Sequence, residues 1–188
     1  MLPRIDSIRT ARLLLRPFTA DDVDDVWSYQ RKEVVARYMP WRERDREETA
    51  AAVRQMVTEN ALSGDGDCLS LAVVDPDAGT VMGQVELVWL SRVDRQGEIG
   101  FVFNPQYQGR GMATEAVREL LHLGFDQLGL HRIVGRCVAK NSASAALLRR
   151  IGMRQEAHFI ESFLLKGSRE DELVYAMLQR EWRPNSIR

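Results

Sequence analysis

Apolar and polar positions in the first third of the chain predict one strand followed by two helices. The apolar run at residues 11–18 is typical of a strand that ends at Pro17, which cannot donate to a sheet. Thr19 is a suitable N-cap for a helix through the Asp-rich stretch that follows, and this pattern favours a solvated helix start over a metal site. A second helix is expected over 46–62, because its apolar residues repeat with helical spacing. These residues are Ala50, Val53, Val57 and Ala61.

The rest of the chain alternates between strand-like and helical patterns. The expected strands are 68–75, 80–90, 97–103, 131–139, 153–165 and 171–178, and the expected helices are 112–128 and the segment from Asn141 or Ser142 to Gly152. The strand, helix and strand between residues 97 and 139 should form a right-handed parallel crossover. The pattern therefore predicts a mixed α/β fold built on one sheet.

Composition narrows the class of protein. A chain of 188 residues is expected to form one domain, 1–188, with a sizeable core. The formal net charge of −1 provides no basic field, so we expect no nucleic-acid partner. We expect no membrane partner either, because no apolar run has the length of a membrane span and the N-terminus lacks a signal-peptide core. Cys68 and Cys137 lie apart in apolar, strand-like runs, which predicts buried free thiols and a cytoplasmic location.

Residues 104–116, "NPQYQGRGMATEA", place two glycines directly before a helix. A helix N-terminus carries unpaired N–H groups and the positive end of the helix dipole. Gly109 and Gly111 let further N–H groups converge without obstruction by a β-carbon, and Arg110 adds a cation. The stretch therefore predicts an anion site, for which phosphate is the commonest ligand.

Three phosphate motifs compete for this loop. A Walker loop requires a Lys that is absent, and a dinucleotide fingerprint requires a third glycine where Thr114 stands. The acyl-coenzyme A pyrophosphate pattern, Q/R-x-x-G-x-G/A, is satisfied by Gln108, Gly111 and Ala113. Taken alone, the loop leaves open a plain glycine turn with an exposed Arg.

Four segments in order make the chain resemble the GNAT superfamily of N-acyltransferases, within its RimJ/RimL-type branch of ribosomal-protein N-terminal acetyltransferases. The segments are "TARLLLRPFTADDVDDV", "GEIGFVFNPQYQGRGMATEAV", "CVAKNSASAALLRRIGM" and "LLKGSREDELVYAML". The resemblance extends from about residue 9 to residue 178. It implies the α/β (α+β) GNAT fold: a mixed, mostly antiparallel seven-stranded sheet, helices on both faces and splayed central strands.

The resemblance also implies an acetyl-CoA-dependent N-acetyltransferase in which a neutral amine attacks the thioester directly. Backbone N–H groups would hold the pyrophosphate, supplied by Gln108, Gly109, Arg110, Gly111, Met112, Ala113 and Thr114. The strand edge at Phe101, Val102 and Phe103 would pair with the pantetheine arm, and the N–H of Val102 or Phe103 would stabilise the oxyanion. Asn141 would bond the pantetheine amide, although it also suits a helix N-cap.

Ser144 would face the sulfur, and its hydroxyl would hydrogen-bond the developing thiolate. The alternative is a serine in the first turn of the helix that is bonded to backbone. Glu98 is the first candidate for a water-relayed base and Glu86 the second, each with the alternative of an outward carboxylate. Glu161 is a further possibility. We expect no metal, because the histidines share no ligand spacing; they are His122, His131 and His158.

The acceptor is the least determined part of the sequence. An apolar wall could be formed by Trp27, Tyr38, Met39 and Trp41, which also suit an ordinary core. Asp65 and Asp67 could attract a cationic amine or simply belong to a solvated loop. Three functions remain open: acetylation of protein N-terminal amines, acetylation of small-molecule amines, and CoA binding by a regulatory module without turnover. A monomer or homodimer is expected.

Overall fold

The computed structural model describes residues 5–183, which fold around one eight-stranded sheet. The strands are β1 (Ile8–Arg9), β2 (Leu14–Pro17), β3 (Cys68–Val74), β4 (Val81–Ser91), β5 (Gln96–Phe103), β6 (Arg132–Val138), β7 (Arg154–Leu165) and β8 (Ser168–Leu178). The helices are α1 (Val23–Gln30), α2 (Glu33–Ala36), α3 (Arg46–Thr58), α4 (Met112–His122) and α5 (Ser142–Arg150). No helix within the described range is long and apolar enough to cross a membrane.

The strand order is β1-β2-β3-β4-β5-β6-β8-β7. Every neighbouring pair is antiparallel except β5 and β6, which form the expected parallel crossover through α4. The expectation of seven strands is one short, because β1 adds a two-residue strand opposite Leu14 and Leu15. The turn between β1 and β2 is closed by Thr10, whose Oγ1 accepts from the N–H of Leu13 at 3.0 Å.

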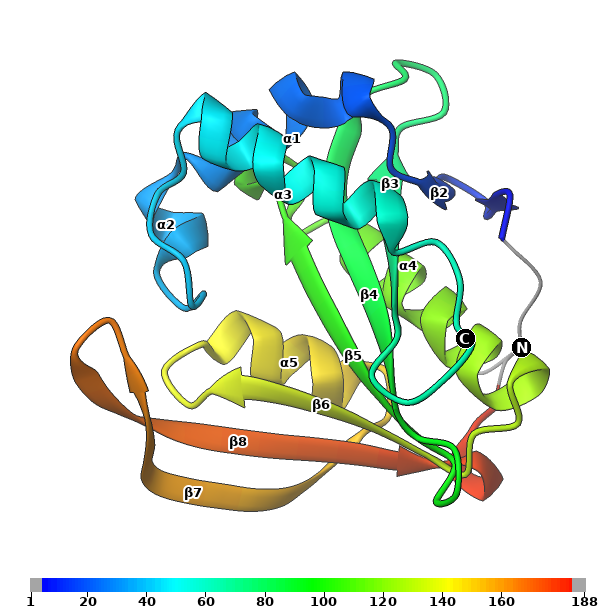
Figure 1. Ribbon diagram of the computed structural model, residues 1–188. Helices are drawn as coiled ribbons and strands as arrows, with labels where there is room; N and C mark the ends of the chain where they lie inside the picture. Colours follow the sequence, from blue (N-terminus) through cyan, green and yellow to red (C-terminus); the bar gives the residue numbers. More distant parts are fainter. Residues whose placement is uncertain (1–4, 184–188) are drawn as a thin grey trace.

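The parallel pairing of β5 and β6 stops early. Its last pair is Ile99 with Gly135, yet β5 continues to Phe103 while β6 continues alongside β8. The two strands diverge from this point, as Figure 1 shows. The expected splay of the central strands is confirmed. We call the region in which β5 and β6 diverge, after Ile99 and Gly135, the splay. In this region one edge of β5 has no strand partner.

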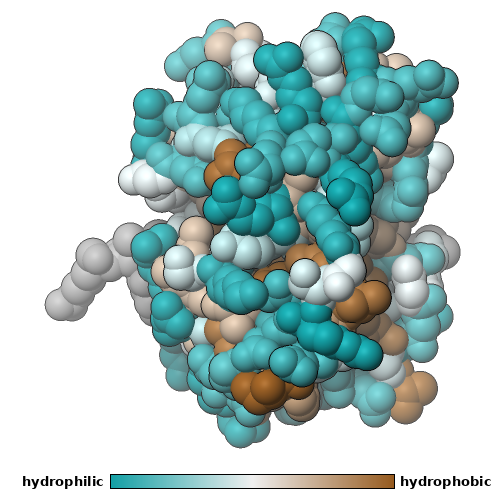
Figure 2. Space-filling model, turned by 90° about the vertical axis from the view of Figure 1, so that its left-hand side faces the viewer, coloured by the Kyte–Doolittle hydropathy of each residue, from teal (hydrophilic) through white to brown (hydrophobic). Residues whose placement is uncertain are grey.

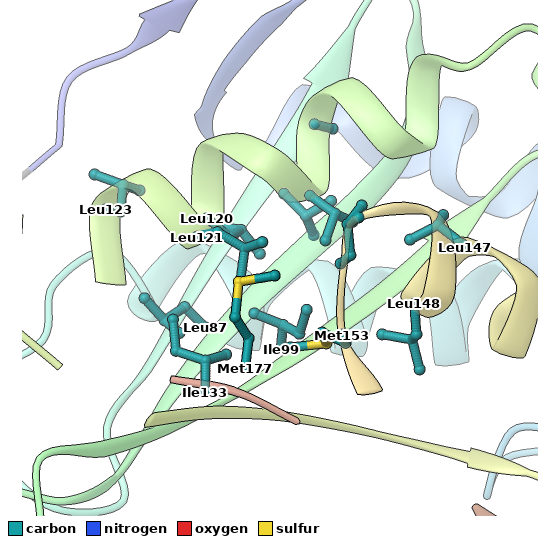
Figure 3. Packing of buried hydrophobic residues seen from close by; sticks show 14 of the residues in the cluster. Leu87, Ile99, Leu120, Leu121, Leu123, Ile133, Leu147, Leu148, Met153 and Met177 are labelled. Atoms are coloured by element: carbon teal, nitrogen blue, oxygen red, sulfur yellow. The ribbon is translucent and has the colours of Figure 1, made fainter. Parts of the chain in front are cut away.

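Helices cover both faces of the sheet. On one face α4 and α5 pack on the larger apolar cluster, where Figure 3 shows Leu120 and Leu121 of α4 lying over Ile99 of β5. On the other face α1 and α3 pack on a smaller cluster that includes Val102 of β5. Because side chains alternate along a strand, β5 contributes side chains to both apolar clusters. The splay therefore lies between the helices of one face and those of the other.

Element ends differ from the sequence expectations at two helices. The helix expected over 46–62 ends at Thr58, and the one expected over 112–128 ends as an α-helix at His122. A π-helical turn, Leu123–Gln127, continues the apolar stripe of α4. It brings Gly124 so close to β6 that an added β-carbon would lie 2.5 Å from Ile133 Cδ1. Both cysteines are free, as expected, but they are partly rather than fully buried.

Candidate active site

The loop between β5 and α4 has the backbone conformation that its glycines allow. Asn104 Oδ1 accepts from the N–H of Gln106 at 3.2 Å and starts a short 3-10 turn. Gly109 and Gly111 have φ angles of 76° and 78°, in the left-handed region that side chains disfavour. The second of these glycines is the N-cap of α4, so the chain turns directly from the loop into the helix.

Six consecutive N–H groups at this turn, from Gly109 to Thr114, have no hydrogen-bond partner in the part of the chain that the structure describes. The first bond of the helix is donated by Glu115 to the carbonyl of Gly111, at 3.0 Å. The N–H of Gln108 is different, because it donates to Pro105 O at 3.2 Å. The expected set of donors therefore starts at Gly109, and the loop has the unsatisfied donors that a phosphate group requires.

Arg12 adds a cation that the sequence pattern does not indicate. Its Nη1 donates to Arg110 O at 3.0 Å, and its Nη2 lies 3.5 Å from the position of a β-carbon built on Gly111. Arg12 is 98 residues away from this carbonyl, so no local motif connects the two. The Arg110 residue is itself exposed. The guanidinium of Arg12 thus lies beside the free N–H groups.

The unpaired edge of β5 continues from the loop into the splay. The N–H of Asn104 donates to Met82 O on the β4 side at 2.9 Å. Because peptide groups alternate in direction along a strand, Val102 also faces β4, whereas Phe101 and Phe103 face the splay. Of the two expected oxyanion donors, Phe103 has the suitable direction. Its carbonyl accepts from Gln108 Nε2 at 3.1 Å.

The start of α5 lies at the end of β6, the other strand of the splay. Asn141 Oδ1 accepts from the N–H of Ser144 at 3.2 Å, so Asn141 is the N-cap of this helix. The hydroxyl of Ser144 is partly buried and forms no hydrogen bond within residues 5–183. The alternative of a serine bonded to backbone is thus not what the structure shows, and the hydroxyl is available to a ligand.

Glu98 belongs to a charged group at the closed end of the splay, where the pairing of β5 with β6 stops. Its carboxylate lies 3.3 Å from Arg136 Nε, and Arg136 also contacts Glu172 at 3.1 Å. Burial raises the pKa of Glu98, and the attraction of Arg136 opposes this effect. Glu161, the more remote candidate, is exposed at a bulge of β7 and its φ is 47°.

Two cavities lie on the sheet face that carries α1 and α3. The larger, of about 640 Å³, is bounded by α3, the segment before it and strands β3 and β4; we call it the acidic cavity. It is lined by Met39, Pro40, Trp41, Arg42, Glu43, Arg44, Glu48, Ala51, Ala52, Gln55, Met56, Glu59, Cys68, Gln84 and Glu86. The smaller cavity, of about 260 Å³, shares Pro40 with it and is bounded by β6 and the β7–β8 hairpin.

The hairpin helps to close the smaller cavity. Lys166 at its turn donates from Nζ to Ala36 O of α2 at 2.7 Å. Figure 2 views the side on which Figure 1 draws α2 and this hairpin, and it shows hydrophobic side chains in the middle and lower parts of this side, among hydrophilic ones. The hairpin itself carries exposed apolar residues of β7, namely Phe159, Ile160 and Leu164.

Some of the expected acceptor residues line these cavities. Met39 and Trp41 line the acidic cavity and Tyr38 lines the smaller one, whereas Trp27 lies outside the described lining of both. Asp65 accepts a hydrogen bond from the N–H of Arg92 at 2.7 Å, which fits the alternative that it belongs to a surface loop. Glu59 and Glu86 both line the acidic cavity, although β3 lies between them in the sequence. The sequence indicates Glu86, as the second candidate base, but not Glu59.

The histidines and Cys68 can be placed among their neighbours in the described range. No group of three or more His, Cys, Asp or Glu residues with suitable geometry lies among the described residues. His122 contacts Asp126 at 2.7 Å and His158 contacts Asp171 at 2.8 Å, which fits structural roles. Burial raises the pKa of Cys68 to about 12, so this cavity-lining thiol is a poor nucleophile.

Comparison with known proteins agrees with this geometry. Residues 12–154 match the family model of the acetyltransferase (GNAT) domain. YnaD of Bacillus subtilis, named an uncharacterized N-acetyltransferase, is 34% identical over 93% of this chain and 98% of its own. The spermidine N(1)-acetyltransferase of Vibrio cholerae is 27% identical over 58% of this chain and 64% of its own. The crystal structure of a GNAT-family acetyltransferase from Bacillus anthracis has 29% identity and a TM-score of 0.84, covering 93% of this chain and 99% of that one.

Proposed function

Since the chain belongs to the GNAT acetyltransferase family and is an N-acetyltransferase, we propose that it acetylates a primary amine by direct attack of the nitrogen on acetyl-CoA. The observation that carries this proposal is the run of unpaired N–H groups from Gly109 to Thr114 at the start of α4. These donors, with Arg12 beside them, fit a diphosphate. When bound, acetyl-CoA supplies the acetyl group as a reactive thioester.

The residues of the splay divide the remaining tasks. The free edge of β5 at Phe101 and Phe103 hydrogen-bonds an extended arm in the manner of an added strand. Phe103 N–H faces the place where the carbonyl oxygen gains negative charge. Asn141, beside the splay, bonds an amide of the arm through its side-chain NH₂ group.

Two side chains act on the charges that develop during the reaction. Glu98 receives, through a water, the proton that the attacking nitrogen loses as the new C–N bond forms. The Ser144 hydroxyl hydrogen-bonds the sulfur as the C–S bond breaks and negative charge develops there. The reaction requires no covalent intermediate on the protein, in agreement with the high pKa of Cys68.

Two classes of acceptor are candidates. The sequence resemblance to the RimJ/RimL-type branch favours the α-amine of a protein N-terminus. An unperturbed α-amine has a pKa of about 7.7–8.0, so a useful fraction is neutral at neutral pH. The likeness to the spermidine N(1)-acetyltransferase of Vibrio cholerae favours a small cationic amine instead.

Release of free thiol from acetyl-CoA tests the proposal. The protein is incubated with acetyl-CoA and, separately, with N-terminal peptides, spermidine and an aminoglycoside, and CoA binding is measured by calorimetry. We expect CoA binding and thiol release with at least one acceptor. Binding without release from any acceptor would instead indicate a regulatory module, and absence of CoA binding would refute the site altogether.

A further inference from the structure

Three residues on adjacent strands form a row that leads from the splay into the acidic cavity. Ser70 of β3 pairs with Glu86 of β4, and Glu86 pairs with Gly100 of β5. Gly100 is the first residue after the last β5–β6 pair, so the row starts where the splay opens. Adjacent strands are about 4.8 Å apart, which places Glu86 one strand spacing from the splay.

A chain of hydrogen bonds fixes the direction of the Glu86 carboxylate. Arg44 Nη1 donates to Gln30 Oε1 at 2.8 Å, and Gln30 Nε2 donates to Gln84 Oε1 at 3.1 Å. Gln84 Nε2 then donates to Glu86 Oε1 at 2.7 Å. Because arginine can only donate, each amide in the chain has one possible orientation. The chain therefore delivers an N–H donor to one oxygen of Glu86.

The other oxygen of Glu86 is left for a ligand. Glu86 Oε2 accepts no hydrogen bond from any described residue. It lies over Gly100, where an added β-carbon would be 3.3 Å from it. A side chain at position 100 would push this oxygen away, so the glycine leaves room for it at the mouth of the splay. Burial raises the pKa of Glu86; Gln84 and Arg44 oppose the effect and Glu59 adds to it.

Glu59 provides a second carboxylate one strand further along the row. It follows the last residue of α3, and its Oε2 accepts a short hydrogen bond from the Ser70 hydroxyl. Neither Glu59 nor Glu86 forms an ion pair with a residue in the described range. Two neighbouring carboxylates in a partly buried cavity repel each other, and a cation placed between them relieves that repulsion.

The rest of the cavity suits an aliphatic cation. Its carboxylates, Glu43, Glu48, Glu59 and Glu86, outnumber its guanidinium groups, Arg42 and Arg44. Arg44 forms no ion pair with a described carboxylate; it donates to Gln30, and its guanidinium carbon lies 4.7 Å from the centroid of the Trp41 ring. Met39, Ala52 and Met56 line the same space and can pack against methylene groups.

We propose that Glu86 and Glu59 bind a second, non-reacting ammonium group of the acceptor, so that the substrate is an aliphatic diamine or polyamine. The reacting nitrogen then lies at the splay, beside Gly100, and the distal nitrogen lies in the acidic cavity. This inference rests on the proposed function and selects the small-molecule class among its candidate acceptors. The cationic chain of such a substrate follows the row of residues from Gly100 toward Ser70.

Calorimetric titration of the CoA-saturated protein with putrescine and with butylamine tests the inference, because the two differ only in the second amino group. We expect putrescine to bind at least about tenfold more tightly, a difference of about 1.4 kcal/mol. Glu86→Gln and Glu59→Gln should each reduce this preference to less than about threefold. Equal binding of the two amines to the unmodified protein, or an unchanged preference in both variants, would overturn the inference.

Two further variants control for the loss of a charge alone and for the position of the Glu86 carboxylate. Glu47→Gln removes the same charge from an exposed position of α3 outside the cavity lining and should keep the preference, since solvent screens that charge. Gly100→Ala places a β-carbon against Glu86 Oε2 and should lower the preference without removing any charge. Thermal melts verify that each variant folds. If a Glu variant does not fold, the preference measured for the Gly100→Ala variant still tests the inference.

The titration also separates this inference from the proposed function. Thiol release by any amine supports the acetyltransferase reaction whatever the outcome for putrescine. Binding of putrescine needs no turnover, so it is measurable even if no acceptor is acetylated. If thiol is released with monoamines and peptides while putrescine binds no more tightly than butylamine, the diamine site is wrong and the proposed reaction stands.

Discussion

Arg12 and Glu115 form an ion pair that joins the β1–β2 turn to the first turn of α4. Arg12 Nε donates to Glu115 Oε2 at 2.8 Å, and Arg12 Nη2 lies 2.7 Å from the same oxygen. Thr10 Oγ1 donates to the other oxygen, Oε1, at 2.6 Å. Since Arg12 also donates to Arg110 O, the pair fixes the glycine loop to the edge of the sheet. It thereby holds a guanidinium beside the free N–H groups of α4.

Arg12→Met should weaken CoA binding about tenfold, which corresponds to about 1.4 kcal/mol. The change removes both a cation near the diphosphate and the bond that holds the loop carbonyl. Stability should fall by less than about 1 kcal/mol, because the Arg12 side chain is half exposed. Arg9→Met, on the same hairpin, is the matched control. Equal CoA dissociation constants for the two variants would show that Arg12 plays no part in the site.

Gly111→Asp should abolish measurable CoA binding. The position has room for a β-carbon, but a carboxylate there would face the diphosphate and would pair with Arg12. The positive φ of Gly111 costs any other residue about 1 kcal/mol, which also applies to Gly111→Asn. The Asn variant is therefore the control for strain, and we expect it to keep weakened but measurable binding by calorimetry. Indistinguishable affinities for Asp and Asn would contradict an anion site here.

Asp22→Asn should destabilise the protein by about 2 kcal/mol at neutral pH, because it breaks a largely buried ion pair. Arg16 contacts both carboxylate oxygens of Asp22, at 2.8 and 2.7 Å, and the N–H of Thr19 donates to one of them at 2.7 Å. Urea unfolding measures the loss. Asp24→Asn, which breaks an exposed ion pair with Arg46, is the control and should cost less than about 1 kcal/mol.

The same variant has a predicted pH dependence. Burial raises the pKa of Asp22, but the bonds to Arg16 and Thr19 outweigh it and the net pKa lies below the ordinary value of 3.8. A lowered pKa stabilises the fold above the unfolded-state pKa and loses that contribution as the pH falls through the folded-state pKa. The difference between the unmodified protein and Asp22→Asn should therefore shrink as the pH falls below 3.8. A constant difference across this range would contradict the assignment.

The sequence predicts most of this fold because each long element carries its own periodicity. The apolar stripe of α4 and the alternation in β5 are visible locally, and the parallel crossover follows from the handedness rule. Strand β1 escapes prediction because its two residues contain no period. The π-turn escapes because the stripe of apolar residues continues through it to Leu128 without a break.

The site is predictable only where its parts are adjacent in the chain. Gly109 and Gly111 stand directly before a helix, so the anion site can be inferred from local rules. Arg12 and Glu59 reach the site through tertiary contacts, and no spacing in the sequence connects them to the loop or to Glu86. The pairing of the Gln108 N–H with Pro105 likewise depends on the turn that forms before the loop.

Ser144→Ala should lower turnover about tenfold or more while leaving the CoA dissociation constant within about twofold. The hydroxyl has no hydrogen bond to lose within the described chain, so stability should change by less than about 0.5 kcal/mol. Ser142→Ala, at the exposed first residue of the same helix, is the control. Single-turnover thiol release measures the effect. Equal rates for both variants would remove Ser144 from the reaction.

Glu98→Gln should reduce kcat/KM at pH 7 by about tenfold to a hundredfold and shift the acid limb of the pH–rate profile to higher pH. Glu98 must lose its proton to act as a base, and burial raises its pKa above the ordinary value of 4.5. Activity of the unmodified protein therefore rises with pH as Glu98 ionises. Without this carboxylate, the amine must lose its proton to solvent, and the limb moves toward the pKa of the amine.

The control for this last prediction is Glu172→Gln, because Glu172 is the other carboxylate bound to Arg136. If Glu98 only holds Arg136 in place, the two variants should have similar rates and the same pH profile. If Glu98 is the base, only its own variant moves the acid limb. Initial rates of thiol release between pH 5 and pH 9, at saturating acetyl-CoA, distinguish the two cases over about the range in which an α-amine titrates. A profile that Glu98→Gln leaves in place would assign Glu98 to the ion pair alone.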